Sequence, residues 1–333
     1  MSRIFDVACL NKKYETMNTV EKVRELSEKI SVALTPLVNR DYWLLEVPYY
    51  SNVGDTLIWQ GERDFLVGLP YKCRGMHSLE SFSFPKIRKD DLILFQGGGN
   101  FGDLWTRHHD FKMKVIETYP ENEFVFLPQT VFFEHEENMK KCAAFLAGKK
   151  VTICARDEAS YRLLMANFSN RILLVPDMAF CIRMEKWYTP SAGKGEFLLK
   201  REDKELQTSA YLSAIEKLEG ITVSDWVTFR GNTKCERIFN RVRRLADRRP
   251  FRVTGLGKKL IDSYGAHIYR PFLVRSGVKQ LGAYETIYTT RLHAAILGVL
   301  LGKKVFFIDN SYGKNSGFYE TWLKDCDSVK MMV

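Results

Sequence analysis

The sequence predicts an α/β protein built from two Rossmann-like parallel-sheet domains that face each other across a cleft. Short, continuously apolar segments alternate with segments of helical periodicity, which is typical of a parallel sheet covered by helices on both faces. Glycine-bearing or polar loops follow several of the apolar segments, as they do at the carboxyl ends of parallel strands. The alternation starts again after Gly220, which indicates a second sheet.

The composition is that of a globular protein. A chain of 333 residues is long enough for about two domains, and 45% hydrophobic with 27% charged residues argues against extensive disorder. The first 14 residues lack the apolar core of a signal peptide, and the most apolar window, 294–301, is far too short to span a membrane. Seven cysteines occur without CxxC or Cys/His metal spacing. We therefore expect reduced thiols, no metal site and a cytoplasmic location.

The sequence pattern of the first half predicts an N-terminal helix followed by alternating strands and helices. Residues 1–40 are expected to be helical because apolar positions recur three and four residues apart. Strands are expected at 43–47, 91–95, 123–127, 151–155 and 172–175, with Pro128 ending the third. Helices are expected between them at 56–67, 104–118, 136–146 and 158–165.

The second half predicts a similar pattern. Strands are expected at 221–223, 251–253, 285–288 and 305–308, separated by a basic helix within 230–259, a further helical stretch and the apolar helix 294–301. The irregular segment 184–204 lies between the two halves, so we predict domains at residues 1–185 and 186–333. Two open α/β domains facing across a cleft form the general shape called GT-B.

The net charge of +10 is concentrated between residues 230 and 259. Nucleic acid would exploit such a patch, but the sequence contains no recognition-helix, zinc-finger or RNP-like pattern, so we expect no nucleic-acid partner. Peripheral contact with an anionic membrane at its inner face is a second interpretation, and a solvated helix face is the third. The charge pattern alone does not choose between the last two.

The segment Thr289-Thr290-Arg291-Leu292-His293 follows an expected strand and precedes the apolar helix. Ligands in α/β proteins bind at this type of strand-to-helix turn. Arg291 offers a planar fork for carboxylate or phosphate, and His293 offers a proton-transfer group. The structural alternative is that Arg291 forms an ion pair and His293 caps the helix.

The loop Gly97-Gly98-Gly99-Asn100 also follows an expected strand. Its backbone amides could hold an anion, whereas three glycines after a strand are also typical of a tight turn. The spacing matches neither the dinucleotide-binding nor the Walker A pattern. Asp103 could act as a base or orient a hydroxyl; alternatively it caps the next helix.

Three further loops carry polar residues at strand ends. Asp55 could bind substrate or cap a helix, and Arg156 could bind an anion or pair locally with the acidic residues after it. Asp177 follows the fifth expected strand. Lys314, in the polar loop after residue 308, could clamp phosphate or could be solvated. His108 and His109 are adjacent on an expected helix and so do not share a face, which disfavours a two-histidine metal site.

The ordered set of these loops resembles the polysaccharide pyruvyl transferase family from about residue 50 to 325. The motifs that carry the resemblance are Asn52-Val53-Gly54-Asp55, Gln96-Gly97-Gly98-Gly99-Asn100-Phe101-Gly102-Asp103, Ala155-Arg156-Asp157-Glu158-Ala159-Ser160, Val175-Pro176-Asp177, Arg291-Leu292-His293-Ala294-Ala295 and Tyr312-Gly313-Lys314-Asn315-Ser316. The resemblance implies a GT-B-like fold, phosphoenolpyruvate as donor substrate, no cofactor, and a saccharide acceptor that is lipid-linked or polymeric.

The implied product is a cyclic pyruvate ketal made during cell-surface or exopolysaccharide biosynthesis. By this resemblance Arg291 and His293 match the family's Arg-x-His pair, and Arg156 matches its donor-binding arginine. His293 would act as the acid or the base, and Asp103 or Asp55 would orient the acceptor. The substrate-binding residues that we predict are Arg291, Arg156, Lys314, Asn100, Gly98, Gly99, Asp55 and Asn315.

Two other functions are compatible with parts of the sequence. A nucleotide-sugar glycosyltransferase of the same shape would need a diphosphate site and an acidic residue for the ribose, which we do not find near 221–226 or 254–257. A non-catalytic basic module would bind polyanions through 241–249 without turnover.

Overall fold

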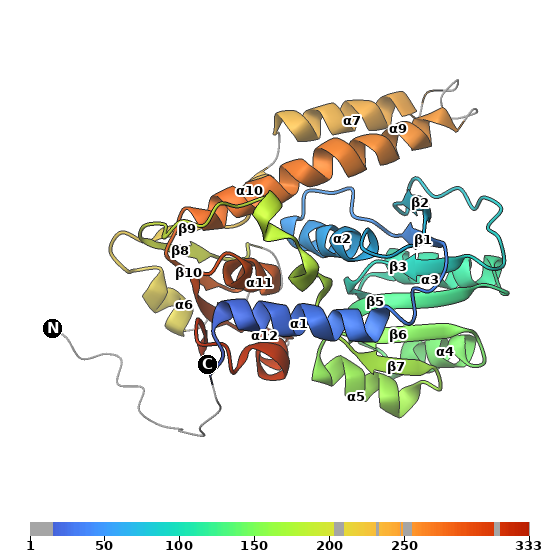
Figure 1. Ribbon diagram of the computed structural model, residues 1–333, viewed down its shortest axis with the longest axis horizontal. Coiled ribbons are helices and arrows are strands. Elements are labelled where there is room, and N and C mark those ends of the chain that lie inside the picture. The colour runs from blue at the N-terminus through green and yellow to red at the C-terminus, as the bar shows by residue number, and fades with distance from the viewer. Residues whose placement is uncertain are drawn as a thin grey trace.

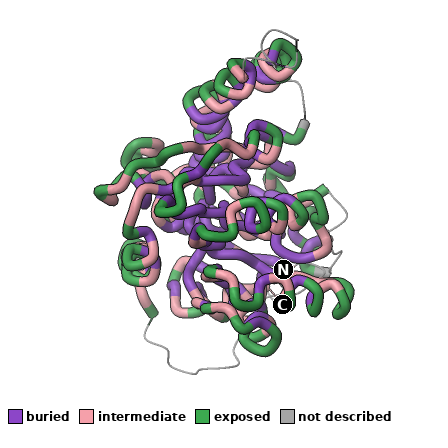
Figure 2. The backbone as a smooth tube through the Cα atoms, turned by 90° about the vertical axis from the view of Figure 1, so that its right-hand side faces the viewer, coloured by how far each residue is buried: buried purple, intermediate pink, exposed green. Residues whose placement is uncertain are grey.

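The computed structural model describes residues 16–202, 210–230, 233–246, 248, 255–309 and 314–332. Within these residues the chain forms two parallel β-sheets with helices packed around them (Figure 1). The strands lie in the buried interior and the outer helices carry most of the exposed backbone (Figure 2). The predicted α/β class with two parallel sheets is confirmed.

The first sheet has the strand order β2-β1-β3-β5-β6-β7, and β4 pairs with the far end of β5. Its strands are β1 (Tyr42–Leu45), β2 (Cys73–His77), β3 (Leu92–Phe95), β4 (Gly98–Gly102), β5 (Glu123–Phe132), β6 (Val151–Ala155) and β7 (Arg171–Leu174). All pairings are parallel, so their carboxyl ends lie at one edge. The accompanying helices are α2 (Val53–Leu66), α3 (Thr106–Thr118), α4 (Glu136–Leu146), α5 (Glu158–Asn167) and the short η1 (Met178–Cys181) and η2 (Met184–Lys186).

The predictions for β4 and β5 were wrong in detail. β5 was expected to end at Pro128 but continues to Phe132, and the ladder with β6 is irregular between Phe126 and Gln129, where the proline lacks an N–H. This extension pairs with β4, which was expected to be a turn. Gly102 has φ of 133°, and a Cβ there would lie 1.7 Å from the Phe132 carbonyl oxygen, so the pairing requires glycine.

The second sheet has the parallel order β12-β11-β10-β8-β9. Its strands are β8 (Glu196–Leu199), β9 (Thr222–Ser224), β10 (Thr286–Thr289), β11 (Lys304–Ile308) and β12 (Val329–Met332). β8 and β12 were not predicted, and the strand expected at 251–253 lies outside the described residues. The accompanying helices are α6 (Ala210–Ile215), η3 (Val227–Arg230), α7 (Lys234–Ala246), α9 (Leu256–Tyr264), η4 (Gly265–Tyr269), α10 (Arg270–Gly282), α11 (Leu292–Leu300), α12 (Lys314–Phe318) and η5 (Tyr319–Leu323).

The first described helix, α1 (Thr19–Leu34), crosses from one sheet toward the other (Figure 1). Within the described residues it is shorter than the predicted 1–40, of which residues 1–15 lie outside the described part of the chain. It begins after Asn18, whose side chain accepts a hydrogen bond from the Glu21 N–H. The buried Lys22 forms an ion pair with Asp325 at 2.8 Å, which ties α1 to the second half of the chain. The division at residues 185 and 186 stays a prediction.

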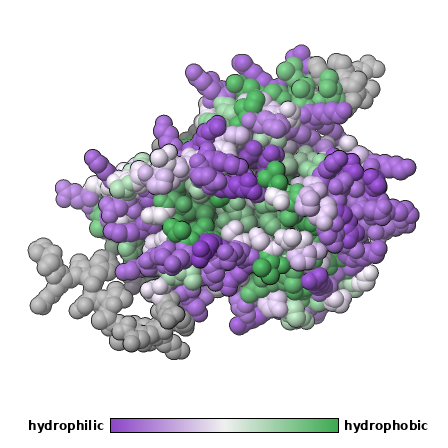
Figure 3. Space-filling view, viewed as in Figure 1, coloured by the Kyte–Doolittle hydropathy of each residue, from purple (hydrophilic) through white to green (hydrophobic). Residues whose placement is uncertain are grey.

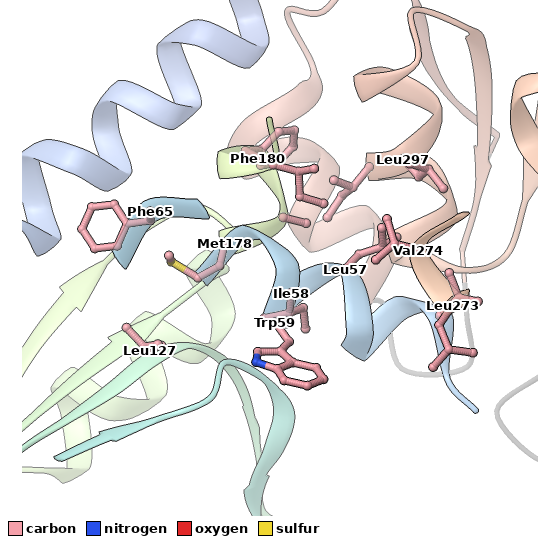
Figure 4. Close-up of a cluster of buried hydrophobic side chains, with 14 of the residues drawn as sticks. Leu57, Ile58, Trp59, Phe65, Leu127, Met178, Phe180, Leu273, Val274 and Leu297 are labelled. Carbon is pink, nitrogen blue, oxygen red and sulfur yellow. The ribbon is translucent and has the colours of Figure 1, made fainter. Parts of the chain in front are cut away.

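One hydrophobic core joins the two sheets through α2 and η1. Figure 4 shows Leu57 of α2 beside Val274 of α10, with Leu297 of α11 nearby, and Trp59 on the side of the first sheet. Leu57 and Trp59 are completely buried. Burial of this kind disfavours free movement of the two sheets relative to each other. No helix in the described part of the chain is both long and apolar enough to cross a bilayer.

Candidate active site

A cavity of about 420 Å³ is lined by residues from the carboxyl ends of both sheets. Its lining residues are Tyr50, Asn52, Asp55, Gly99, Asn100, Trp105, His108, Thr130, Arg156, Arg201, Trp226, Arg291, Leu292, His293 and Asn315. Seven of the predicted site residues are in this set; Gly98 and Asp103 are not, and the side chain of Lys314 lies outside the described residues. A larger hollow of about 580 Å³ lies at the opposite edge of the first sheet and contains none of the predicted residues.

Arg156, Asp177 and His293 form a compact cluster in the cavity wall. The Arg156 Nη1 donates to Asp177 Oδ2 at 2.8 Å, and the same oxygen lies 3.3 Å from His293 Nε2. The Arg156 Nη1 and His293 Nε2 are 3.4 Å apart. Arg156 Nε donates to Thr130 Oγ1 at 2.8 Å, which fixes the orientation of the guanidinium. Residues from the two sheets therefore meet at one buried carboxylate.

Asp177 is completely buried and remains an anion. Burial alone would raise the pKa of its carboxyl, but the His293 imidazole and the Arg156 guanidinium outweigh burial and hold the pKa well below its usual range. The backbone N–H of Ala179 adds a hydrogen bond of 2.9 Å to the other oxygen. The carboxylate can therefore orient the His293 ring.

Arg291 is held by Asp225, at the end of β9. The Arg291 Nε and Nη2 donate to the two oxygens of Asp225 at 2.6 and 2.5 Å, a bidentate geometry. The Arg291 guanidinium also lies 4.9 Å from the Phe229 ring centre. The structural ion pair considered for Arg291 therefore exists, and it positions the guanidinium in the cavity wall.

His293 does not cap α11. The N-cap of that helix is Arg291, and its side chain makes no capping hydrogen bond. The His293 ring instead lies against the start of α2, where a Cβ at Gly54 would be only 2.9 Å from His293 Nδ1. Glycine at position 54 is therefore needed for the close approach of α2 to the imidazole.

Asp55 lies in the first turn of α2 without capping it. The cap is Asn52, whose Oδ1 accepts the Gly54 N–H at 2.8 Å. Asp55 Oδ2 accepts hydrogen bonds from the Tyr50 hydroxyl and the Asn52 Nδ2, both at 2.8 Å. The carboxylate is thus fixed at the cavity wall.

The glycine loop supplies Gly99 and Asn100 to the cavity. The Arg156 Nη2 lies 3.7 Å from the position that a Cβ at Gly99 would take, so glycine leaves this edge of the guanidinium uncovered. Behind the loop, the buried Glu62 accepts the Gly97 N–H at 2.8 Å. Burial, reinforced by nearby carboxylates, raises the pKa of Glu62 well above its usual value.

A second histidine, His108 on α3, reaches the same cavity. Its Nδ1 lies 2.6 Å from Glu46 Oε1, and Glu46 is also bound by the completely buried Lys112 at 2.5 Å. Glu46 follows β1 with φ of 73°, which is uncommon for a residue with a side chain. This conformation and the two partners hold the carboxylate beneath His108.

Two predicted residues have other positions, and a third is described only in part. Asp103 binds the segment that precedes α4, because its carboxylate accepts hydrogen bonds from the Glu134 N–H, the His135 N–H and the Asn138 amide. Gly98 lies in β4 with φ of 130°, outside the cavity lining. Lys314 begins α12, but its side chain lies outside the described residues. Asn315 lines the cavity, and its amide donates to the Thr290 and Ile308 carbonyl oxygens.

The sequence analysis missed Asp225 and His108. Asp225 lies within 221–226, where we found no acidic residue to bind a ribose. It nevertheless follows a strand, which is the position that marked the other candidate residues. His108 was considered only together with His109 as a metal pair. Among the described residues, no group of three or more His, Cys, Asp or Glu side chains could hold a metal ion.

Comparison with known proteins identifies the family of this chain. The family model described as polysaccharide pyruvyl transferase matches residues 52–312. The putative pyruvyl transferase EpsO of Bacillus subtilis is 30% identical over 95% of this chain and 96% of its own length. Pyruvyl transferase 1 of Schizosaccharomyces pombe is 26% identical over 87% of this chain and 72% of its own.

A solved structure has a similar fold. An uncharacterized protein of Klebsiella pneumoniae superposes with a TM-score of 0.63 at 19% identity, over 92% of this chain and 98% of the other. At this level of identity the likeness concerns the fold alone. The family match and the relatives establish the chemical class: this chain is a transferase that belongs to the polysaccharide pyruvyl transferase family.

Proposed function

We propose that this enzyme transfers the pyruvyl group of phosphoenolpyruvate to two hydroxyls of one sugar and forms a cyclic ketal in cell-surface or exopolysaccharide biosynthesis. The methylene carbon of the donor gains a proton, the first hydroxyl attacks the resulting cationic carbon, and the second hydroxyl displaces phosphate. The observation that carries the proposal is the buried cluster of Arg156, Asp177 and His293 beside Arg291 in one cavity.

The arginines fit a donor that carries both a carboxylate and a phosphate. Arg156 and Arg291 come from different sheets, and each is oriented by a buried aspartate. Arg201 adds a third guanidinium to the lining. Planar forks held in this way suit two anionic groups on one small molecule. Lys314 stays a candidate for the phosphate, as the sequence suggested.

His293 is the group that we assign to proton transfer. Its Nε2 faces Asp177, which fixes the orientation of the ring in the cavity wall. An imidazole held in this way suits an acid that delivers a proton to the methylene carbon. The same ring could afterwards accept a proton from a sugar hydroxyl.

The acceptor side of the cavity combines hydroxyl-binding groups with an aromatic ring. Asp55 and Asn100 offer oxygen and amide groups, and Trp105, which is 45% exposed, offers a flat surface for the apolar face of a sugar ring. Asp55 is the residue that we assign to acceptor orientation, since the Asp103 carboxylate is bound to the segment before α4. The expectations of a lipid-linked acceptor, a cytoplasmic location and the absence of a cofactor stay predictions.

A nucleotide-sugar glycosyltransferase is less well supported. Asp225 is an acidic residue at a strand end of the second sheet, but both of its oxygens are bonded to Arg291. It is therefore not available for a ribose unless the ion pair breaks, and breaking a buried pair costs about 3–5 kcal/mol.

Donor choice is tested by ligand-dependent thermal stabilisation. A true donor binds the folded state and raises the unfolding temperature by mass action. We expect phosphoenolpyruvate to stabilise the wild-type protein and UDP-sugars to have no effect. Arg156→Lys and Arg291→Lys keep the charge beside each aspartate but lose the fork, so both should weaken this stabilisation. Stabilisation by a UDP-sugar alone would reject the proposed donor.

A further inference from the structure

The pair of helices α7 and α9 forms a hairpin that projects from the body of the molecule (Figure 1). Residues 234–268 contain ten Lys or Arg and three Asp or Glu, so this short segment carries a net charge of +7 out of the chain's +10. The proposed reaction uses none of these residues.

The inner face of the hairpin is firmly packed. The Phe239 ring stacks on Tyr264 and Tyr269 at 5.3 and 4.8 Å and meets Tyr49 edge-on at 5.9 Å. A Cβ at Gly257 would lie 2.5 Å from the carbonyl oxygen of Ala246, so α7 and α9 approach closely. The exposed residues of the hairpin are therefore held on a defined surface.

The acidic and basic side chains of the hairpin lie on opposite sides. The two described acidic residues of the hairpin face the body: Glu236 accepts from the Ser51 hydroxyl at 3.3 Å, and Asp262 accepts from the Tyr49 hydroxyl at 3.0 Å. Basic side chains are exposed along the outside, and those described are Lys234, Arg237, Arg241, Arg244, Arg248 and Lys259. The outer surface is therefore positive.

Large aliphatic side chains lie among these cations. Ile238 and Leu245 of α7 are 47% and 42% exposed, and Leu256 and Leu260 of α9 are 47% and 42% exposed. Within each helix the two residues are four or seven positions apart, so they lie on one side. Hydrophobic residues gather on the hairpin on the face seen in Figure 3. We define Ile238, Leu245, Leu256, Leu260 and the exposed basic residues as the hairpin surface.

We propose that the hairpin surface docks on an anionic lipid bilayer. A solvated helix face would not expose four large aliphatic residues, and binding of nucleic acid depends mainly on cations and aromatic stacking. An interfacial helix instead buries aliphatic side chains among the head groups while Lys and Arg contact anionic lipids.

The hairpin also contacts the edge of the cavity. Glu236 is bonded to Ser51, and the Arg243 guanidinium donates to the Tyr49 carbonyl oxygen. The neighbours of Ser51 in the chain, Tyr50 and Asn52, line the cavity. Docking would thus bring the acceptor side of the cavity close to the bilayer, where a lipid-linked saccharide is found. This consequence rests on the proposed function, whereas docking itself does not.

Docking is tested by sedimentation with vesicles in the absence of donor and acceptor. We expect the full chain to sediment with vesicles of phosphatidylcholine and phosphatidylglycerol, but not with phosphatidylcholine alone. The triple variant Arg237→Gln, Arg241→Gln, Lys259→Gln should lower the partition coefficient roughly a hundredfold. The double variant Leu245→Ser, Leu256→Ser should also lower the partition coefficient, and this loss should depend less on salt than the loss in the triple variant.

A matched control removes three exposed cations elsewhere, with Lys89→Gln, Lys140→Gln and Lys141→Gln. It should bind vesicles like the wild-type protein, and thermal unfolding verifies that all variants fold. Equal losses in the control and the hairpin variants would overturn the proposal. So would the absence of binding to anionic vesicles, binding to single-stranded nucleic acid instead, or a dimer that the leucine variants dissociate without changing vesicle binding.

Turnover separates this proposal from the proposed function. Hairpin variants should keep wild-type turnover with a short water-soluble hexoside and lose it with a lipid-linked acceptor in vesicles. Absence of wild-type turnover with either acceptor would contradict the proposed function, and vesicle sedimentation would still decide docking.

Discussion

Each of two arginines in the cavity wall is held by a buried aspartate. Arg156 is bound by Asp177 and Arg291 by Asp225, and both carboxylates are almost fully buried. A buried ion pair adds little net stability, because desolvation offsets most of the attraction. What these pairs supply is a fixed orientation of the guanidinium in the absence of ligand, which lowers the entropy cost of binding.

The sequence predicted the arginines but not their partners. Arg156, Arg291 and His293 could be found because each follows a strand, and the carboxyl ends of parallel strands meet. Their partners could not be assigned, since pairing depends on which strands lie side by side. The local partners expected for Arg156 are engaged elsewhere: Glu158 pairs with Arg162, and Asp157 caps α5.

Glu62 predicts a distinct pH dependence of stability. Its folded-state pKa lies well above the unfolded value, so its contribution is full at low pH and declines as pH rises toward the folded pKa. In Glu62→Gln this decline is absent, so the stability of the variant relative to wild type should rise by up to about 1.4 kcal/mol per pH unit. Urea unfolding between about pH 5 and 8 measures it. Parallel pH profiles would mean that Glu62 is ionised in the folded protein.

At the scale of elements, the start of α2 is the segment that brings the two sheets together at the site. Asn52 caps the helix, Gly54 contacts His293, and Asp55 faces the cavity. The sequence predicted a helix here but began it at residue 56, because the polar residues before it resemble a loop. The hydrogen bond from Gly54 to the Asn52 side chain explains why the helix starts earlier.

The approach of α2 to His293 predicts the effect of Gly54→Ala. Alanine favours the helix by up to about 1 kcal/mol, which offsets part of the cost of moving the His293 ring, so the variant should still fold. Its Cβ would displace the His293 ring, and we expect kcat to fall roughly tenfold to a hundredfold. Gly317→Ala is the control, since its Cβ would meet nothing within 4 Å. Equal kcat in both variants would show that the close approach of α2 to His293 does not affect turnover.

Elements that depend on distant contacts were the ones that sequence periodicity missed. β4 consists of glycine-rich sequence that has no strand propensity, and it exists because the far half of β5 offers a partner. No strand was predicted where β8 and β12 lie. β8 falls within the expected boundary segment, and β12 falls near the end of the chain. Long apolar strands such as β3 and β6 were predicted correctly because both faces are buried.

At the scale of the whole molecule, the two sheets share one core. Leu57 on α2 lies between elements of both sheets, with Val274 and Leu297 on its far side. A second link comes from the C-terminal region, where Trp322 Nε1 donates to the Arg156 carbonyl oxygen at 2.7 Å. The pattern of the sequence predicted two units, but it could not predict how tightly they would be joined.

This shared core predicts a single unfolding transition. Leu57→Ala removes buried contacts on both sides, so we expect the free energy of unfolding to fall by about 2–5 kcal/mol. The near-ultraviolet and far-ultraviolet circular dichroism signals, which report tertiary and secondary structure, should have the same midpoint in urea. Val32→Ala, at a residue 78% exposed, should change stability by less than about 0.5 kcal/mol. Two separate transitions would show that the sheets unfold independently.

The central claim is that the cavity transfers pyruvate from phosphoenolpyruvate to a sugar. The most direct measurement is the mass of the sugar product, recorded together with phosphate release, from purified protein, phosphoenolpyruvate and a pool of lipid-linked and nitrophenyl hexosides. We predict a sugar that gains a pyruvate ketal in step with phosphate release, with His293→Gln retaining donor binding but almost no turnover. Full activity in His293→Gln would contradict the assigned proton transfer. A modified sugar without phosphate release, or a glycosyl product from a nucleotide sugar, would contradict the claim itself.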